Sequence, residues 1–292
     1  MDALSRILQR LQLRAEILAH VAYCGHWAVD TSGKRMASFH LIQRGNCWLH
    51  VEGRAPQLLN AGDFVLFPHD SPHIVSSGPE ITEDIVINQP EPDQEGPATQ
   101  MLCGYFEFQS RAMWPLLDGL SPVVVIDLAS SMELGDTQRL LQLIIHELSV
   151  EQPGNKEVID KLAYVLFVHV LRSEMRRGQT AGLLAALNDP KVGQALNLIH
   201  YDPSAPWSLE QLARKVGMSR SSFAERFRDL VGESPMRYLT AWRMQQAVDL
   251  LTQGDLSVSA VAEACGYQSE VAFRKAFRSV VGKTPGEVRQ SA

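Results

Sequence analysis

The sequence predicts an α+β protein of two domains, an N-terminal domain of short strands with a helical pair and a C-terminal domain made only of helices. The length of 292 residues suits about two domains. Short runs rich in aromatic and β-branched residues fill positions 14–128, and helical periodicity replaces them from about residue 136 onward. The composition, 45% apolar and 21% charged, is that of a globular protein and excludes fibrous and disordered classes.

The sequence lacks a membrane span and a secretory signal, so we expect a cytosolic protein. No run approaches the ~18 uninterrupted apolar residues of a membrane span, so we expect no membrane partner. The first thirteen residues carry charges among their leucines, unlike a secretory signal. The cysteines are widely spaced and are expected to be reduced thiols in the cytosol, with Cys47 and Cys265 in structural positions.

The N-terminal strands are predicted from their residue types and from the turn residues between them. Each run is short and apolar, and Gly45, Gly53 and Gly62 separate neighbouring runs. Strands at this spacing are typical of a small barrel or sandwich. The stretch 76–100 combines six acidic residues with several prolines, which predicts a long acidic loop. The clearest strands are expected at 39–42, 47–51, 64–67 and 123–126.

Two amphipathic helices are predicted next. Apolar residues recur at helical spacing over 140–148, and again over 158–170 after Pro153 and Gly154. Asn155 is expected to be the N-cap of the second helix, which should end near Arg177. One face of the pair belongs to the core, and we expect residues 136–177 also to form a homodimer contact. Residues 178–180 are expected to be a linker.

An internal repeat of about 50 residues occupies the C-terminal third. The first unit is SLEQLARKVGMSRSSFAERFRDLVGESP, and the second is SVSAVAEACGYQSEVAFRKAFRSVVGKTP. Each predicts a short helix, a turn at Gly217 or Gly266, and a second helix. A small residue, Ala213 or Ala262, lets the two helices cross closely, and the glycine permits a tight turn. This is the layout of a helix-turn-helix unit.

The second helix of each unit has an apolar face and a polar face. Phe223, Phe227 and Leu230 are expected to point inward in the first unit, and Phe273, Phe277 and Val280 in the second. The outward side chains are polar or basic, which suits contact with base edges in a major groove. A solvated helix face is the plain alternative. The outward candidates are Ser221, Ser222, Ala224, Glu225 and Arg228, then Glu270, Val271, Arg274, Lys275 and Arg278.

The connection between the units supports the nucleic-acid interpretation. Residues 235–251 form one helical pattern with Pro235 in the first turn. A helix of this length spans about 25 Å, and major-groove faces on one side of B-DNA repeat every ~34 Å. One chain is therefore expected to contact two adjacent major grooves of an asymmetric site.

The distribution of charge along the chain also supports nucleic-acid binding by the C-terminal third. The formal net charge of −6 disfavours nucleic acid if it is taken as an average. Residues 190–292 hold 13 lysines and arginines against 10 aspartates and glutamates, whereas residues 1–189 hold 14 against 23. The C-terminal third is therefore basic, and the acidic remainder is expected to face away from phosphate.

This segment closely resembles the DNA-binding domain of the AraC/XylS family of transcriptional regulators over about residues 190–290. The resemblance is carried by GMS at 217–219, RMQQAVDLL at 243–251, VAEACGY at 261–267, GKTP at 282–285 and the two phenylalanine pairs. It implies seven helices with two helix-turn-helix units, over a domain of residues 188–292. By motif position it also implies that Arg243 and Arg278 face the DNA backbone. Glu225 departs from the pattern, because many members carry arginine there.

The N-terminal domain resembles the cupin family more weakly, which implies a cupin-like sensor barrel over residues 1–130 and a helical connector over 131–180. GDFVLFPHDSPH at 62–73 is similar to the second cupin motif. The first motif is not intact, because Thr31, Ser32 and Ser38 stand where its histidines and glutamate are expected. The metal site of a cupin enzyme is therefore incomplete.

A different ligand set is possible in this domain. Cys24, His40, His73 and Cys103 are the candidates, and two thiolates with two imidazoles suit tetrahedral zinc. A zinc-bound thiolate would also respond to oxidants. The alternative is that His40 and His73 are hydrogen-bonded barrel residues and the cysteines are small buried apolar groups.

The sequence therefore predicts a sequence-specific DNA-binding regulator and not an enzyme. The expected partners are double-stranded promoter DNA, RNA polymerase and an effector of unknown identity that biases one arrangement of the two domains. A metal-dependent cupin enzyme with an added helical domain is one alternative. An architectural DNA-binding protein without a ligand is another.

Overall fold

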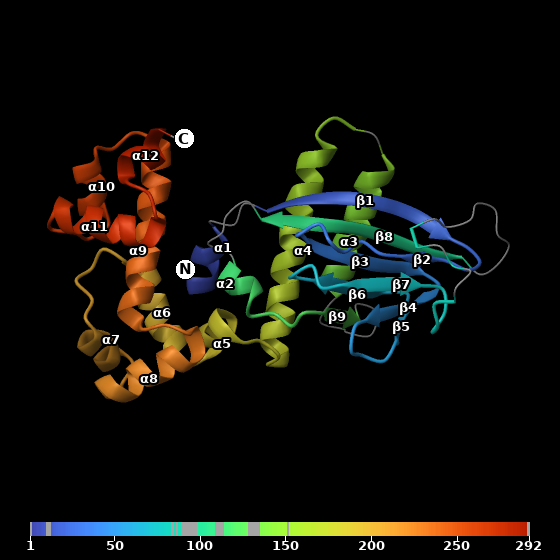
Figure 1. Cartoon of the computed structure of the whole chain (residues 1–292), viewed down its shortest axis with the longest axis horizontal. Coiled ribbons are helices and arrows are strands. Elements are labelled where there is room, and N and C mark those ends of the chain that lie inside the picture. Colours follow the sequence, from blue (N-terminus) through green and yellow to red (C-terminus); the bar gives the residue numbers. More distant parts are fainter. Residues whose placement is uncertain are drawn as a thin grey trace. The chain divides into compact units, whose positions relative to one another are not determined.

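The computed structural model describes residues 2–9, 13–82, 85, 87–88, 98–108, 114–127, 135–150 and 152–290. The chain divides into two compact units (Figure 1). The strand unit is Leu11–Thr180, and the helical unit combines Met1–Arg10 with Ala181–Ala292. Part of the expected acidic loop, including residues 89–97, lies outside the described residues.

Two antiparallel sheets form the strand unit, and they face each other without joining into one closed barrel. The first has the order β1-β8-β3-β6-β9, from β1 (Leu13–Tyr23), β8 (Thr99–Phe108), β3 (Ala37–Arg44), β6 (Asp63–Phe67) and β9 (Val124–Asp127). The second has the order β2-β7-β4-β5, from β2 (Ala28–Val29), β7 (His73–Ser76), β4 (Asn46–Val51) and β5 (Gln57–Asn60). All four expected strands are confirmed, as β3, β4, β6 and β9.

The core of the strand unit lies between the sheets. It takes apolar side chains from both, and its fully buried members include Trp27, Ile42, Leu59, Phe67 and Met101. Cys47 belongs to the same cluster, which confirms its structural position. Alternation along β3 explains this, because Ser38, His40 and Ile42 point inward while Phe39 and Leu41 point to the other face.

Helix α4 (Asn155–Arg177) covers the outer face of the first sheet from edge to edge (Figure 1). The carboxylate of Asp160 accepts a hydrogen bond of 3.0 Å from the backbone of Ala15 on β1, and Phe167 contacts Phe106 on β8. Helix α3 (Gly135–Ser149) packs on α4, and α2 (Trp114–Leu117) is short. Both predicted helices are confirmed.

The predicted cap of α4 is wrong. Gly154 takes the N-cap position in a left-handed conformation, and Asn155 is the first residue of the helix. The side-chain amide of Asn155 instead donates to the carbonyl of Glu147, at 2.9 Å, and to that of Val150. It therefore satisfies carbonyl groups at the end of the preceding helix, which otherwise lack partners.

The helical unit contains α1 (Ala3–Leu8), α5 (Gly182–Asn188) and the seven helices expected for residues 190–290, a stretch that is described without gaps. These are α6 (Val192–Tyr201), α7 (Leu209–Lys215), α8 (Arg220–Val231), α9 (Pro235–Gln253), α10 (Val258–Ala264), α11 (Glu270–Val281) and α12 (Pro285–Gln290). The N-terminal helix α1 packs on α6, where Ala3 donates a backbone hydrogen bond to Asn197. Among the described helices, none combines the length and apolar character needed to cross a bilayer.

Candidate functional site

Helices α8 and α11 are the second helices of the two repeat units, and each is built in the same way. Ser219 and Ser269 are their N-caps, and each hydroxyl accepts a hydrogen bond from the backbone three residues on. Phe223 and Phe227 in α8 are fully buried, as are Phe273 and Phe277 in α11. These aromatic pairs fix which face of each helix is left to solvent.

The sequence prediction of the inward face is wrong at one position. Val280 is 47% exposed, although its spacing from Phe277 places it near the inward stripe. The inward stripe continues instead through Val281, one turn after Phe277, which packs against the same core cluster.

The structure places nearly all of the outward candidates of α8 and α11 in solvent. Val271, an apolar side chain with no cover, is 78% exposed. Ala224 and Glu270 are half-buried, and the exposed candidates are Ser221, Ser222, Glu225, Arg228, Val271, Arg274, Lys275 and Arg278. Glu270 and Arg274, one turn apart, form an ion pair at 2.7 Å. Among these candidates, Ser221 and Ser222 near the start of α8 are small and neutral, whereas most of those on α11 are charged.

Arg243 has a structural role that the sequence did not indicate. Its Nε donates to the carbonyl of Pro203 at 2.6 Å, and Nη2 donates to the carbonyl of Ala205 at 2.8 Å. The guanidinium also lies over the ring of Tyr267, with 5.7 Å to the centroid. Arg243 therefore ties α9 to the loop between α6 and α7, and it holds the second unit close to that loop.

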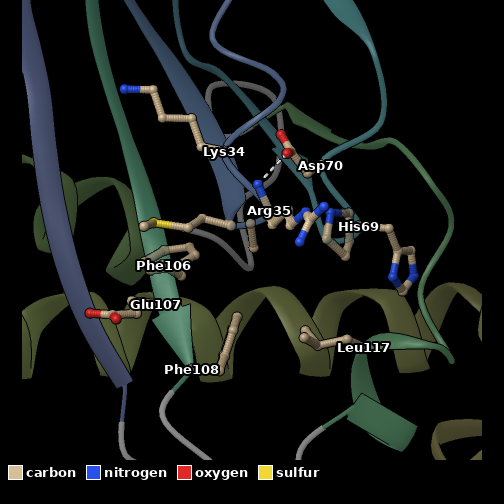
Figure 2. Close-up of a pocket in the computed structure, with 11 residues that line it drawn as sticks. Lys34, Arg35, His69, Asp70, Phe106, Glu107, Phe108 and Leu117 are labelled. Carbon is tan, nitrogen blue, oxygen red and sulfur yellow. Dashed lines mark hydrogen bonds between the residues drawn. The ribbon is translucent and has the colours of Figure 1, made fainter. Parts of the chain in front are cut away.

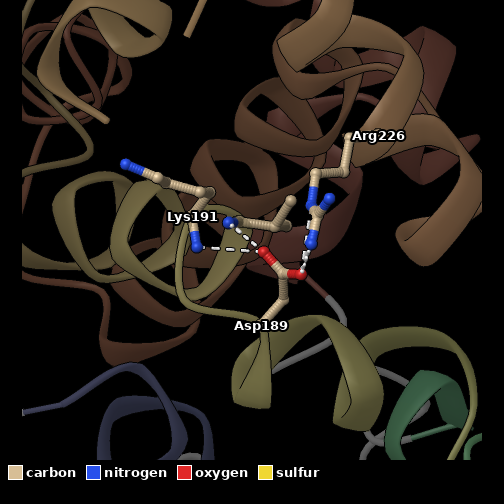
Figure 3. Close-up of polar contacts among 4 residues, drawn as sticks. Asp189, Lys191 and Arg226 are labelled. Carbon is tan, nitrogen blue, oxygen red and sulfur yellow. Dashed lines mark hydrogen bonds and ion pairs between the residues drawn. The ribbon is translucent and has the colours of Figure 1, made fainter. Parts of the chain in front are cut away.

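Arg226 on α8 forms an ion pair with Asp189, which precedes α6 (Figure 3). The sequence did not indicate this contact. Nη2 and Nε of Arg226 lie 2.5 and 3.1 Å from the same carboxylate oxygen of Asp189. The other oxygen of Asp189 accepts backbone hydrogen bonds from Lys191 and Val192 at the start of α6. Partial burial raises the pKa of Asp189, but these hydrogen bonds outweigh it and hold the pKa below its ordinary value.

The two units are joined by α9, whose nineteen residues correspond to about 28 Å. Pro235 is at its first position, as predicted. In Figure 1, α7 and α8 gather near one end of α9, and α10, α11 and α12 near the other. The helix is therefore a rigid spacer between two helix-turn-helix units.

A polar cluster interrupts the apolar core of the strand unit. His40 on β3 is directly opposite Cys103 on β8, and both point between the sheets. His73 enters from β7 in the other sheet, and Thr31 lies beside both imidazoles. The Nε2 atoms of His40 and His73 are 3.1 Å apart, and Nδ1 of His40 is 3.2 Å from Sγ of Cys103. Three of the four predicted zinc ligands therefore meet, and Cys24 is not among these contacts.

One backbone carbonyl fixes the protons of this cluster. Burial lowers the pKa of His40 to about 3 and also lowers that of His73, so both imidazoles are neutral near pH 7. Nδ1 of His73 must donate to the carbonyl of Ser71, at 2.8 Å, because a carbonyl only accepts. Nε2 of His73 is then an acceptor, so Nε2 of His40 carries the proton. Nδ1 of His40 is left to accept from the thiol of Cys103.

This arrangement does not fit a zinc site. A metal needs lone pairs that converge on one point, whereas His40 directs one nitrogen to Cys103 and the other to His73. Burial raises the pKa of the Cys103 thiol to about 12. Among the described residues, no three His, Cys, Asp or Glu side chains are placed to hold a metal ion. The geometry matches the alternative, a hydrogen-bonded pair of core histidines.

Comparison with known proteins covers both units. The family model described as "Cupin" matches residues 2–176, and the one described as "Helix-turn-helix domain" matches residues 212–291. A protein named as an AraC-like transcription regulator from Streptomyces lividans is 34% identical over 99% of this chain and 98% of its own length. The RCS-specific HTH-type transcriptional activator RclR of Escherichia coli K12 is 27% identical over 99% of this chain and 98% of its own.

A solved structure also matches part of this chain. The DNA-binding domain of AdpA, a global transcriptional factor determined in complex with a target DNA, is 36% identical to this chain. The match covers 35% of this chain and 92% of that domain, with a TM-score of 0.34.

Proposed function

The chain belongs to the AraC-like family of transcriptional regulators, with an N-terminal cupin domain and a C-terminal helix-turn-helix domain, and from this premise we propose that α8 and α11 are its two recognition helices. The observation that carries the proposal is the repeated pairing of a buried phenylalanine face with an exposed polar face on both helices. Its full-length relatives are named as regulators, which supports a regulator rather than a cupin enzyme.

The two recognition helices are proposed to make different contacts. On α11, Arg274 and Lys275 supply the charge for guanine edges and phosphates, and Arg278 lies one turn further along. On α8, Ser221 and Ser222 offer hydroxyl groups, and Arg228 is the exposed cation among the candidates. The spacer α9 is close enough to one helical repeat of B-DNA for both helices to enter neighbouring major grooves of one site.

The test is binding of the full chain to its own promoter region. Arg274→Ala with Lys275→Ala should weaken specific binding at least 100-fold and remove the footprint over one groove, because two charged contacts are lost. Arg44→Ala with Arg54→Ala removes the same charge from exposed positions of the strand unit and is the matched control. An unchanged footprint in the first variant would sink the assignment of α11.

Other partners follow from the same premise. We infer a homodimer through residues 136–177, because Leu143, Val158 and Val165 on α3 and α4 are 53%, 41% and 41% exposed. We also infer that the strand unit binds an effector and that RNA polymerase contacts the DNA-bound protein in the cytosol. Sedimentation should give a dimer for the native chain and a monomer for Leu143→Glu. A monomeric native chain at micromolar concentration contradicts the dimer.

A further inference from the structure

We propose that Val271 on α11 contacts the 5-methyl group of a thymine in the major groove, and that this contact sets a base preference of the second recognition helix. The inference rests on the proposed function and names the base chemistry of that site. Among the described residues, Val271 is the large apolar side chain with the greatest exposed fraction, 78%. Single exposed apolar side chains are common on protein surfaces, so the neighbours of Val271 decide what it contacts.

Val271 begins a stripe of cations along the solvent face of α11. Arg274, Lys275 and Arg278 follow it at the third, fourth and seventh positions, which lie on one face of an α-helix. All three cations are exposed, whereas the phenylalanine pair of the same helix is buried. Protein interfaces exclude charge from their apolar centres, but phosphates flank the base edges of DNA. An apolar side chain among cations therefore suits a groove of DNA.

The strand unit places apolar side chains in a different setting. Phe106, Phe108 and Leu117 line a pocket of about 540 Å³, a volume that a small molecule can fill (Figure 2). Val271 stands on a helix face instead, so covering it takes a partner with a groove that accepts the whole helix. The major groove of B-DNA, about 12 Å wide, accepts an α-helix.

Thymine is the base whose major-groove edge carries an apolar group. Its 5-methyl group distinguishes it from the other bases, whose edges there present hydrogen-bond donors and acceptors. Val271 is the second residue of α11, and the N-terminal residues of a recognition helix are those that contact base edges. Its side chain has no donor or acceptor, so a methyl group is the feature of a base edge that it can recognise.

Glu270 sets the neighbouring contact, because it holds Arg274 in one orientation. Oε1 of Glu270 accepts a hydrogen bond from Nε of Arg274 at 2.7 Å and lies 2.7 Å from Nη2 as well. Three other N–H groups of the guanidinium are left, and two of them form the parallel pair that binds O6 and N7 of guanine. Arg274 is about 4.5 Å beyond Val271 along the helix, and base pairs are ~3.4 Å apart. The thymine is therefore expected next to a guanine.

The first unit lacks this apolar side chain. Ser221 has the place of Val271, because each precedes the first phenylalanine of its pair by two residues. Ser221 is exposed as well, but its hydroxyl both donates and accepts hydrogen bonds. The contact with a methyl group is therefore assigned to α11 alone, and serine is the natural replacement for testing it.

The experiment replaces each thymine in the footprint of the full chain, one at a time, by uracil, which lacks only the methyl group. One uracil should weaken binding about fourfold, the value expected for burying one methyl group. It should lie in the groove whose protection is lost in the variant Arg274→Ala with Lys275→Ala. Val271→Ser should bind the thymine and uracil duplexes equally. Val280→Ser changes another exposed valine of α11, outside the stripe, and should keep the fourfold difference.

Three results would overturn the proposal: no uracil in that groove weakens binding, Val271→Ser keeps the preference for thymine, or Val280→Ser loses it. Neither valine belongs to the core cluster of the second unit, so both variants are expected to fold. The footprint separates this proposal from the assignment of the helices. A chain that protects both grooves but responds to no methyl group keeps α11 as a recognition helix and loses only the role of Val271.

Discussion

The two helix-turn-helix units have the same framework but are anchored to the domain in different ways. Gly217 and Gly266 occupy the same turn position, with φ of 68° and 77°. A Cβ on Gly217 would meet nothing closer than Nζ of Lys191, at 3.5 Å, whereas one on Gly266 would clash with the carbonyl oxygen of Ser204 and lie 2.9 Å from its Cα. Sequence symmetry therefore hides a difference in packing: only the second turn is pressed against the rest of the domain.

The largest expected effect is the difference in stability between alanine substitutions at these two glycines. Gly217→Ala should cost about 1–2 kcal/mol in the free energy of unfolding, which is the strain of a left-handed alanine. Gly266→Ala adds a backbone clash and should cost about 3 kcal/mol or more. Urea unfolding of the full chain, followed by helical circular dichroism, measures both. Equal losses would show that Ser204 does not constrain the second turn.

The next effect concerns charge at equivalent positions. Glu225 and Lys275 have the same place in their units and are both exposed, yet their charges are opposite. Lys275→Glu should weaken promoter binding about 30- to 100-fold, because it removes a cationic contact and adds repulsion. Glu225→Lys should strengthen binding and steepen its salt dependence by about one charge. Neither change should shift the unfolding midpoint, so a shift would mean that the side chain is structural.

The sequence predicted the framework of this comparison but not the anchors. Phenylalanines at helical spacing and turn glycines are local signals, and they identified both units. The ion pair of Arg226 with Asp189 joins residues 37 apart, and no local pattern marks either partner. In the strand unit, His40 and Cys103 face each other only through the register of β3 with β8, 63 residues apart. For the same reason, the sequence did not show that His40 directs one nitrogen to Cys103 and the other to His73.

The third prediction concerns the ion pair between Arg226 and Asp189. Asp189→Ala should cost about 1 kcal/mol through the lost hydrogen bonds at the start of α6, and it should loosen α8 but not α11. The pKa of Asp189 is lowered in the folded state, so its contribution is complete above the unfolded value of 3.8 and disappears as the pH falls through the folded value. Hydrogen exchange resolved by helix is the measurement. Equal loss of protection in α8 and α11 would contradict a local anchor.

The smallest expected effect is a gain. Ser208 and Gln211 form a reciprocal capping box at α7, in which the Gln211 side chain accepts from the Ser208 backbone at 2.9 Å. Ser257 caps α10 in the same way, but the third position is Ala260, which has no group to return the bond. Ala260→Gln should therefore stabilise the second unit by about 0.5 kcal/mol, and Gln211→Ala should destabilise the first by a similar amount. If Ala260→Gln lowers the unfolding midpoint, the half-buried position of Ala260 has no room for the longer side chain, and the second unit is packed more tightly than the first at this end as well.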